Sequence, residues 1–361
     1  MFGRLLAASA AAFLLSNCSI HPVPEDVTGV NTYHIARQIR CEAREAAAKF
    51  LIRQLRRLGT DHEDQPADPI ARRWVENYDA DPESISAFTP EVFAGPKYEQ
   101  VRNFYRVIYS TGIAYNFDLT MNEENDIGTT INLLGRWARK FTLGVTGDFN
   151  RGRSNERSFT VTDMFSNILR NLNTPVRGQR YCDGQIAQAN YIYPIAGHIG
   201  VDELVKTFYE LVYLGGLTEA DGGPGAIGPP TIADKLTFTT TIDGSLTPKV
   251  IFTPVGSGFQ LADASGTGMA MRTDTHKVTV GLAIDKNALA LLGSLRGFLF
   301  SRDRSASPRI GSLPSRPTEA SAGGIFIGNT LTAQARTSAE EMAARAVDQL
   351  KSRELQLIRA P

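Results

Sequence analysis

The sequence lacks the residue patterns that usually reveal a catalytic centre or a bound cofactor. Its five histidines are scattered, and none has the His-x-x-x-His or Glu-x-x-His spacing that presents two metal ligands on one helical face. It contains neither a phosphate-binding loop nor a Gly-x-Ser-x-Gly elbow. The glycines of 223–228 have the spacing of a dinucleotide fingerprint, but Pro229 and Pro230 stand where a helix should begin. We therefore expect no catalytic residue, no cofactor and no metal, and the sequence favours a protein that is not an enzyme.

An excess of charge of one sign is also missing. Lys and Arg together number 38, and Asp and Glu together number 38. Proteins that bind nucleic acid through its backbone carry a clear excess of basic residues. We therefore expect no nucleic-acid partner.

Long apolar runs are scarce, and the one at the N-terminus is informative. Residues 5–15 are mostly apolar and follow Arg4, but a bilayer-spanning helix needs about 20 such residues. A short positive start, an apolar stretch and a polar exit are the anatomy of a secretory signal peptide. The exit, Leu15-Ser16-Asn17-Cys18, resembles the lipobox of bacterial lipoproteins, although Asn17 replaces the usual Gly, Ala or Ser.

The resemblance to a lipobox implies where the mature protein begins and where it resides. It implies cleavage before Cys18, so that residues 1–17 are a lipoprotein signal peptide, and a diacylglyceryl thioether on Cys18. Ser19 at the next position implies the outer membrane, with the folded body in the periplasm and the lipid anchor as the contact with the membrane. The alternative is an ordinary signal peptide with a chance cysteine.

Cysteine is rare, and its count has a consequence. Of the three cysteines, lipidation of Cys18 would leave Cys41 and Cys182. In an oxidising compartment an even remainder indicates a disulfide. The alternative is two separate buried thiols.

Composition divides the mature chain into segments. Residues 18–30 are rich in Pro, Glu, Asp and Gly and are expected to form a tether. The other expected segments are a helix with a first β block (31–195), a helix with a second β block (196–300), a mobile linker rich in Ser, Pro and Arg (301–324) and a C-terminal helical segment (325–361). The first helix, 31–58, is basic on one side, which suits either anionic headgroups or a solvated face; a disulfide at Cys41 favours packing on the body.

Strict alternation of apolar and polar residues marks the β blocks. Odd positions of 113–121 are apolar, while Asn116, Asp118, Thr120 and Asn122 are polar, and 141–150 and 159–162 alternate in the same way. Turn-like residues at 123–126 and 151–155 divide this region into about four antiparallel strands, and a second block covers 236–284 with a turn at Asp243-Gly244. We predict an α+β fold, predominantly antiparallel β and sandwich-like, with flanking helices.

Three classes of function suit these features. The first is a lipid-anchored envelope protein of non-enzymatic type with a binding, scaffold or assembly role. The second is an oligomeric secretion or pore component, in which each protomer contributes amphipathic strands such as those of 113–161. The third is a periplasmic hydrolase with an unrecognised site. The expected partners are the membrane, through the lipid anchor, and other proteins or further copies of the chain.

Overall fold

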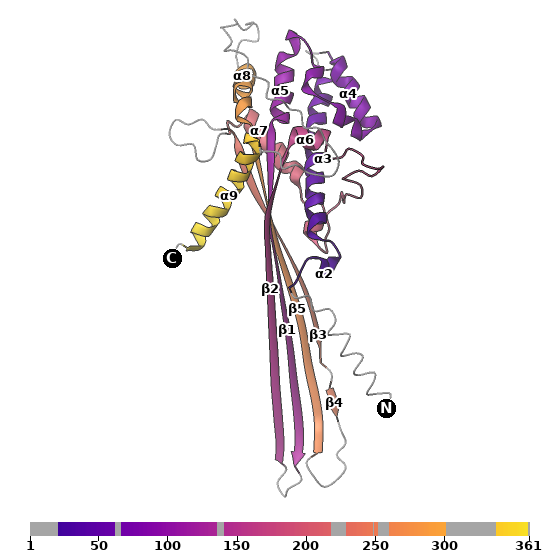
Figure 1. The fold of residues 1–361 in the computed structure, drawn as a ribbon, viewed down its shortest axis with the longest axis vertical. Coiled ribbons are helices and arrows are strands. Elements are labelled where there is room, and N and C mark those ends of the chain that lie inside the picture. The colour runs from indigo at the N-terminus through magenta and orange to yellow at the C-terminus, as the bar shows by residue number, and fades with distance from the viewer. Residues whose placement is uncertain are drawn as a thin grey trace.

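A long antiparallel sheet projects from a helical head in the computed structural model of the chain (Figure 1). The structure describes residues 21–61, 66–135, 141–217, 229–247, 249–251, 260–300 and 337–359. The predicted signal peptide, Cys18 and the predicted linker 301–324 lie outside the described residues. No helix among those that the structure describes is both long enough and apolar enough to cross a membrane.

The head is built around α3 (Thr32–Leu58), which begins where the sequence predicts it. The Asn31 side chain accepts a hydrogen bond from the His34 N–H at 2.9 Å and so caps the helix. Ile35, Ile39, Leu51 and most other apolar residues of α3 are buried, so the apolar side of this helix packs in the core. The helices that complete the head are α4 (Pro69–Ala80), α5 (Glu99–Tyr109), α6 (Phe165–Arg170), α7 (Val201–Tyr213) and α8 (Leu289–Phe300).

The sheet consists of two hairpins joined side by side. Its strands are β1 (Thr111–Gly135), β2 (Phe141–Met164), β3 (Thr231–Leu246), β4 (Lys249–Ile251) and β5 (Gln260–Ile284). Their order is β2-β1-β5-β3, with β4 also paired to β5, and every pairing is antiparallel. At about 3.3 Å per residue, the 25 residues of β1 extend for roughly 80 Å.

The predicted α+β class with antiparallel strands is confirmed, whereas the sandwich-like pairing of two sheets is not. Strands from both β blocks share one sheet because β1 pairs with β5 along its length. Helices, instead of a second sheet, cover it near the head. The segment boundaries drawn at residues 195 and 300 remain predictions.

The predicted turns at 123–126, 151–155 and 243–244 are wrong, because the strands continue through them. Their polar side chains find partners across the ladder: Arg153 forms an ion pair with Glu123 at 2.9 Å, and the Ser154 hydroxyl donates to Asn122 at 2.6 Å. Cross-strand pairing of this kind stabilises a strand whose composition resembles a turn.

Near the head, both faces of the sheet are covered. Odd positions of β1, from Ile113 to Met121, are fully buried in the main core with the head helices. The bidentate pair between Arg40 of α3 and Asp163 of β2, with both distances 2.7 Å, ties the helix to this face. On the opposite face, α9 (Ser338–Arg359) packs on Ala114 and Ala283.

The segment predicted as a tether is attached to the sheet from Pro22 onward. Asn155 donates to the Pro22 carbonyl at 2.8 Å, and Arg272 donates to the Val23 carbonyl at 2.7 Å. A short helix, α2 (Glu25–Thr28), follows. The prediction of a free tether over residues 18–30 is therefore wrong for its described part.

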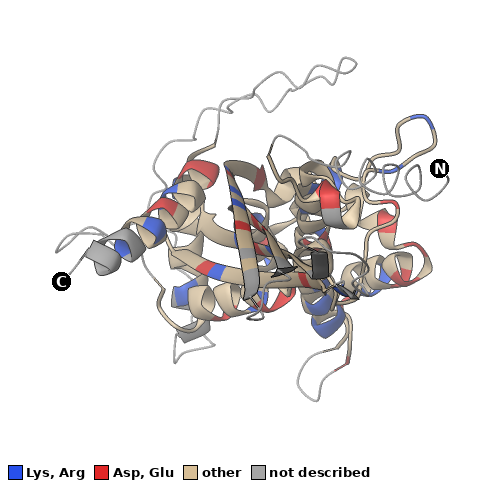
Figure 2. Cartoon of the chain, turned by 90° about the horizontal axis from the view of Figure 1, so that it is seen from below, with Lys and Arg blue, Asp and Glu red and all other residues tan. Residues whose placement is uncertain are grey.

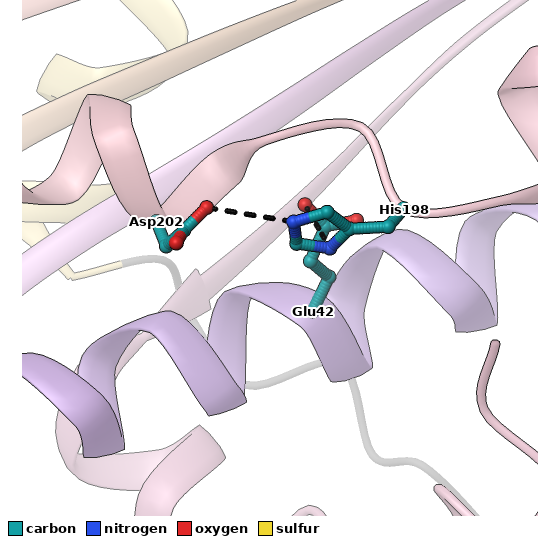
Figure 3. Close-up of side chains that lie close together, drawn as sticks. All are labelled: Glu42, His198 and Asp202. Carbon is teal, nitrogen blue, oxygen red and sulfur yellow. Dashed lines mark ion pairs between the residues drawn. The ribbon is translucent and has the colours of Figure 1, made fainter. Parts of the chain in front are cut away.

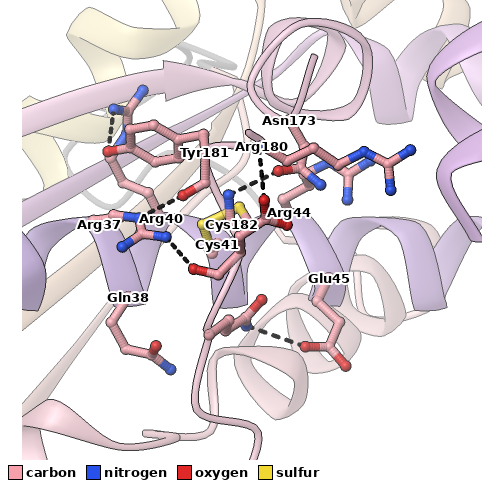
Figure 4. Close-up of a disulfide and its surroundings, with 12 residues drawn as sticks. Arg37, Gln38, Arg40, Cys41, Arg44, Glu45, Asn173, Arg180, Tyr181 and Cys182 are labelled. Atoms are coloured by element: carbon pink, nitrogen blue, oxygen red, sulfur yellow. Dashed lines mark hydrogen bonds between the residues drawn. A yellow bond between two sulfur atoms is a disulfide. The ribbon is translucent and has the colours of Figure 1, made fainter. Parts of the chain in front are cut away.

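The predicted disulfide between Cys41 and Cys182 is confirmed (Figure 4). It joins α3 to a segment of irregular backbone 141 residues further along the chain. Gln38 supports the same junction, since its side chain both donates to the Ile186 carbonyl at 2.7 Å and accepts from the Ile186 N–H at 2.9 Å.

Replacing Cys182 with Ser should lower the free energy of unfolding by about 3–5 kcal/mol, because the unfolded chain loses a cross-link that closes a long loop. Urea unfolding without reductant, followed by circular dichroism, measures the change. Wild-type protein treated with dithiothreitol is the matched control and should unfold at the same midpoint as Cys182→Ser. Equal midpoints for oxidised wild type and variant would contradict this role of the disulfide.

Candidate functional site

The part of the sheet furthest from the head has one exposed apolar face. We call residues 124–135, 141–152, 243–246 and 260–271 the distal sheet. Phe149, Ile127, Gly268 and Leu246 lie in one row across its four long strands. The three side chains in this row are 63%, 58% and 73% exposed, respectively. Large apolar side chains at such exposure indicate a surface that contacts another protein or a membrane.

The other face of the distal sheet is largely polar. The row on the head side of Ile127 carries Asn150, Asp126 and Ser245, with Met269 as an apolar exception, and the row on its other side includes Asp148 and Thr267. Over the described residues, Figure 1 shows no helix on either face of the distal sheet. The distal sheet is therefore amphipathic and uncovered.

The alternation continues in the sequence to the end of the first hairpin. Ile131 and Leu133 of β1 pair with Val145 and Leu143 of β2, so all four positions have the same parity as Ile127 and Phe149. Apolar residues of this parity therefore recur along the hairpin from the row of Ile127 to its last pairs, interrupted by the row of Thr129 and Gly147. We call this series of positions the apolar stripe.

A buried polar cluster, which we call the neck cluster, separates the head core from the distal sheet. Asp274 accepts from Arg272 at 2.8 Å and from the Tyr193 hydroxyl at 3.0 Å, and Tyr193 also contacts His276. Arg272 further contacts Glu123 of β1 at 3.2 Å. These groups lie on the same face as the core residues Val278 and Val280, so the buried face changes from apolar to charged where the head ends.

Burial lowers the pKa of His276 from its ordinary 6.5 to about 4. The neighbouring Asp274 carboxylate opposes this shift, and Arg272 adds to it. The imidazole is therefore neutral at neutral pH and suits a structural role in the neck cluster.

A second polar group, Glu42, His198 and Asp202, lies in the head (Figure 3). His198 Nδ1 is 3.2 Å from a Glu42 oxygen, and His198 Nε2 is 3.6 Å from Asp202. The three side chains are close enough together to be considered as metal ligands.

The hydrogen bonds of Glu42 favour a structural role for this group. Its two oxygens accept from the backbone N–H groups of Ile199, Gly200 and Val201 at 2.9, 2.7 and 2.8 Å. The carboxylate therefore caps the start of α7, where a negative charge is stabilising.

Sequence reasoning missed both clusters. His198 and Asp202 stand four residues apart, a spacing that signals proximity on a helix, but Glu42 is 156 positions before His198 and only the fold reveals it. In the neck cluster, Arg272, Asp274 and His276 alternate along β5, a signal of one shared face. Of the predicted site residues, Cys41 and Cys182 are brought together as a disulfide, and Cys18 remains a predicted lipidation site.

A small cavity of about 190 Å³ lies beside the disulfide, lined by Val30, His34, Arg37, Gln38, Ile186 and neighbours. Sites for small organic ligands are usually about 300–1,000 Å³. This cavity is therefore too small to suggest an organic ligand of ordinary size.

The fold and the two-faced sheet define an α+β protein whose antiparallel sheet extends far beyond its helical core. The chain belongs to the y4kA family: residues 21–289 match the family described as "Uncharacterised protein y4kA". A relative of that name from Sinorhizobium fredii (strain NBRC 101917 / NGR234) is 31% identical over 284 residues, covering 77% of this chain and 82% of the relative. The family match covers all of the described strands and the head helices other than α8, which begins at its last residue.

Likeness to solved structures is weak. The secretin InvG of the Salmonella SPI-1 type III secretion injectisome aligns with a TM-score of 0.20 at 8% identity, covering 55% of this chain and 77% of that one. Aeromonas hydrophila ExeD aligns with a TM-score of 0.22 at 9% identity, covering 60% of each chain. Scores of this size establish no shared fold.

The stability of the fold should fall as the pH drops from 6.5 towards 4, in part because of His276. The unfolded state binds a proton on this imidazole below its ordinary pKa of 6.5, whereas the folded state binds it only near 4. The expected loss is about 3 kcal/mol, complete below pH 4. Urea unfolding at a series of pH values measures it.

The variant His276→Gln is the control for this prediction, because glutamine keeps a hydrogen-bonding side chain but does not titrate. Its stability should depend less steeply on pH between 6.5 and 4 than that of the wild type. Parallel pH profiles for the two proteins would show that another group causes the acid sensitivity.

Proposed function

We propose that this protein is a lipid-anchored pore component of the outer membrane, and that several copies assemble into a ring with one closed, membrane-inserted sheet. The observation that carries the proposal is the distal sheet, apolar and exposed on one face, polar on the other and free of covering helices. In a membrane pore built of strands, the apolar face contacts lipid and the polar face lines water.

The length of the apolar stripe fits a bilayer. From the row of Ile127 and Phe149 to the end of β1 at Gly135 there are eight residue steps, or roughly 26 Å. The outward apolar band of membrane-spanning strands is about 25 Å tall, and such strands need about 9–11 residues. Arg151, two residues before the stripe on the same face, is exposed and suits a position among phosphate headgroups.

The edges of the sheet require further copies. Among the described strands, β2 and β3 each pair on one side only; β3 ends at Leu246 in the row of Ile127, and beyond that row β4 pairs with β5 instead. An unpaired edge is not tolerated in a lipid environment, and four strands are too few to close on themselves, since small closed sheets have about eight. Because the four long strands alternate in direction, β2 of one copy and β3 of the next would meet antiparallel. The same hydrogen-bonding pattern would then continue around the ring.

The attachment of Pro22 and Val23 to the sheet supports a lipid anchor on Cys18 near the start of the apolar stripe. Pro22 and Val23 are hydrogen-bonded to Asn155 and Arg272, which share the face of the apolar stripe and lie between it and the head. Cys18 precedes Pro22 by four residues and so lies within about 14 Å of it. Acyl chains on Cys18 would enter the membrane near the end of the stripe that is closest to the head, which supports a head in the periplasm.

The exposed apolar side chains alone suit contact with another protein or with a membrane; the bilayer-like length of the stripe and the polar opposite face favour the membrane. Native mass of the full-length protein, extracted in mild detergent without reductant, separates the two. A large uniform assembly supports the pore, and a stable monomer or dimer would favour the scaffold role instead.

Phe149→Asp should abolish channel formation in planar lipid bilayers, because it places a charge on the lipid-facing side of every copy in the ring. A charge on the lipid-facing side of a membrane strand opposes insertion, and in a ring this cost is repeated in every copy. The matched control is Asn150→Asp, which adds the same charge one residue away on the exposed polar face and should leave channels intact. Equal loss in both variants, or in neither, would contradict the assignment of the two faces.

Disulfide trapping should detect the proposed contact between copies. A cysteine at Ser154 of β2 should form cross-links between copies with a cysteine at one or more odd positions of β3, among them Thr239 and Thr241, since these share the polar face. Within one copy, β2 and β3 are three strand spacings apart, about 14 Å, which is too far for a disulfide. Non-reducing electrophoresis of assembled protein shows the cross-links.

Thr240→Cys is the control, because it lies on β3 between these positions but on the opposite face. It should give no dimer with the cysteine at Ser154. Assemblies of full size that cross-link at none of the odd positions from 237 to 245 would show that the ring uses a different contact.

A further inference from the structure

The C-terminal helix lies on the polar face of the sheet. Met342, Ala343 and Val347 of α9 pack on Ala114 and Ala283, and these two positions have the same parity as the polar residues of β1 and β5. In Figure 1, α9 stands on the opposite side of the sheet from α3. Figure 2, viewed from below, shows basic and acidic residues side by side along the helix next to the C-terminus.

Two glycines let the helix backbone approach the sheet directly. A Cβ atom at Gly112 would lie 2.4 Å from the carbonyl carbon of Ala339, and one at Gly281 would lie 2.4 Å from the carbonyl oxygen of Ala343. Any larger residue would push α9 away from the sheet. The seat for α9 is therefore built into the two central strands.

An ion pair fixes the helix further along the sheet. Lys351 Nζ is 2.9 Å from Asp118 and donates to the Asn116 side chain at 2.8 Å. Ser338, at the start of α9, donates to Asp285 at 2.7 Å. The helix is thus held at both ends of its contact with the polar face.

The outward side of α9 is polar. Glu341, Arg345, Asp348 and Ser352 recur at helical spacing, and all four are exposed. Arg345 and Glu341 form an ion pair at 2.6 Å. A stripe of this chemistry suits water and does not suit lipid.

We propose that α9 lines the mouth of the channel on the side of the head and narrows it. This inference rests on the proposed function: if the polar face of the sheet is the channel wall, the α9 of every copy stands inside the channel. A helix with its side chains is about 10–12 Å across, so a ring of them reduces the open width of the mouth substantially. Glu341, Arg345 and Asp348 then face the permeating ions and solutes.

Thiol modification of the full-length protein in planar bilayers tests this assignment. Asp348→Cys channels should lose at least half of their conductance when a charged, bulky methanethiosulfonate reagent is added. The matched control is Arg73→Cys, an exposed residue of α4 in the head on the other side of the sheet, which should conduct unchanged after the same treatment. Wild-type channels exposed to the reagent show whether the native cysteines respond.

Removal of residues 338–361 provides a second measurement. Channels without α9 should have a conductance at least about two-fold higher, because removing a helix about 10 Å wide from every copy widens the mouth. Lys351→Glu, which reverses the charge beside Asp118, should give conductance that fluctuates between the wild-type and the wider level.

The outcomes separate this inference from the proposed function. Wild-type protein that forms no channels would contradict the pore itself. Wild-type channels that are insensitive to thiol modification at residue 348, and unchanged in conductance without α9, would support the pore but overturn the placement of α9 in its mouth.

Discussion

The pairing of β1 with β5 is the contact on which the rest of the structure depends. It joins the two hairpins through β1 and β5, which are more than 100 residues apart in the sequence, and runs almost the whole length of both strands. This ladder creates both surfaces that the helices use: the apolar face against α3 and the small-residue seat for α9. Because pairings between such distant strands form slowly, the disulfide and the local helices of the head would hold the hairpins near each other during folding.

Side chains on one face of this sheet change in character twice along its length. Near the head they are apolar and buried, from Ile113 to Met121; at the neck cluster they are charged and still buried; in the distal sheet they are apolar and exposed. The neck cluster satisfies its own charges through Arg272, Asp274 and Glu123, so the head core ends without an open apolar edge. In a single copy, the apolar residues of the head are therefore buried from water, while the apolar face of the distal sheet stays exposed.

Part of this arrangement was predictable from the sequence. Alternation from Ile113 onward predicts strands with one buried face, Asn31 and Gly59 mark the ends of α3, and the cysteine count predicts the disulfide. The continuity of the strands was not predictable, because Glu123 and Arg153 resemble turn residues until their pairing across the ladder is known. Glu42 at the start of α7 and Lys351 beside Asp118 likewise depend on contacts between segments far apart in the chain. Local patterns report which face of an element is buried but not which distant element buries it.

A single copy of the proposed pore component has surfaces that only assembly with further copies would bury or pair. Its edge strands β2 and β3 and the stripe around Phe149 and Leu246 invite association in water, yet the closed sheet that satisfies them exists only in the membrane. A lipid anchor close to the neck would address this conflict, because it confines every copy to the membrane surface at one height and orientation. Strands β2 and β3 of neighbouring copies, which run in opposite directions, would then meet at the same height on the membrane surface and at high local concentration. In this view the anchor acts on assembly as much as on localisation, and the rigid attachment of Pro22 and Val23 to the sheet is what transmits its position to the strands.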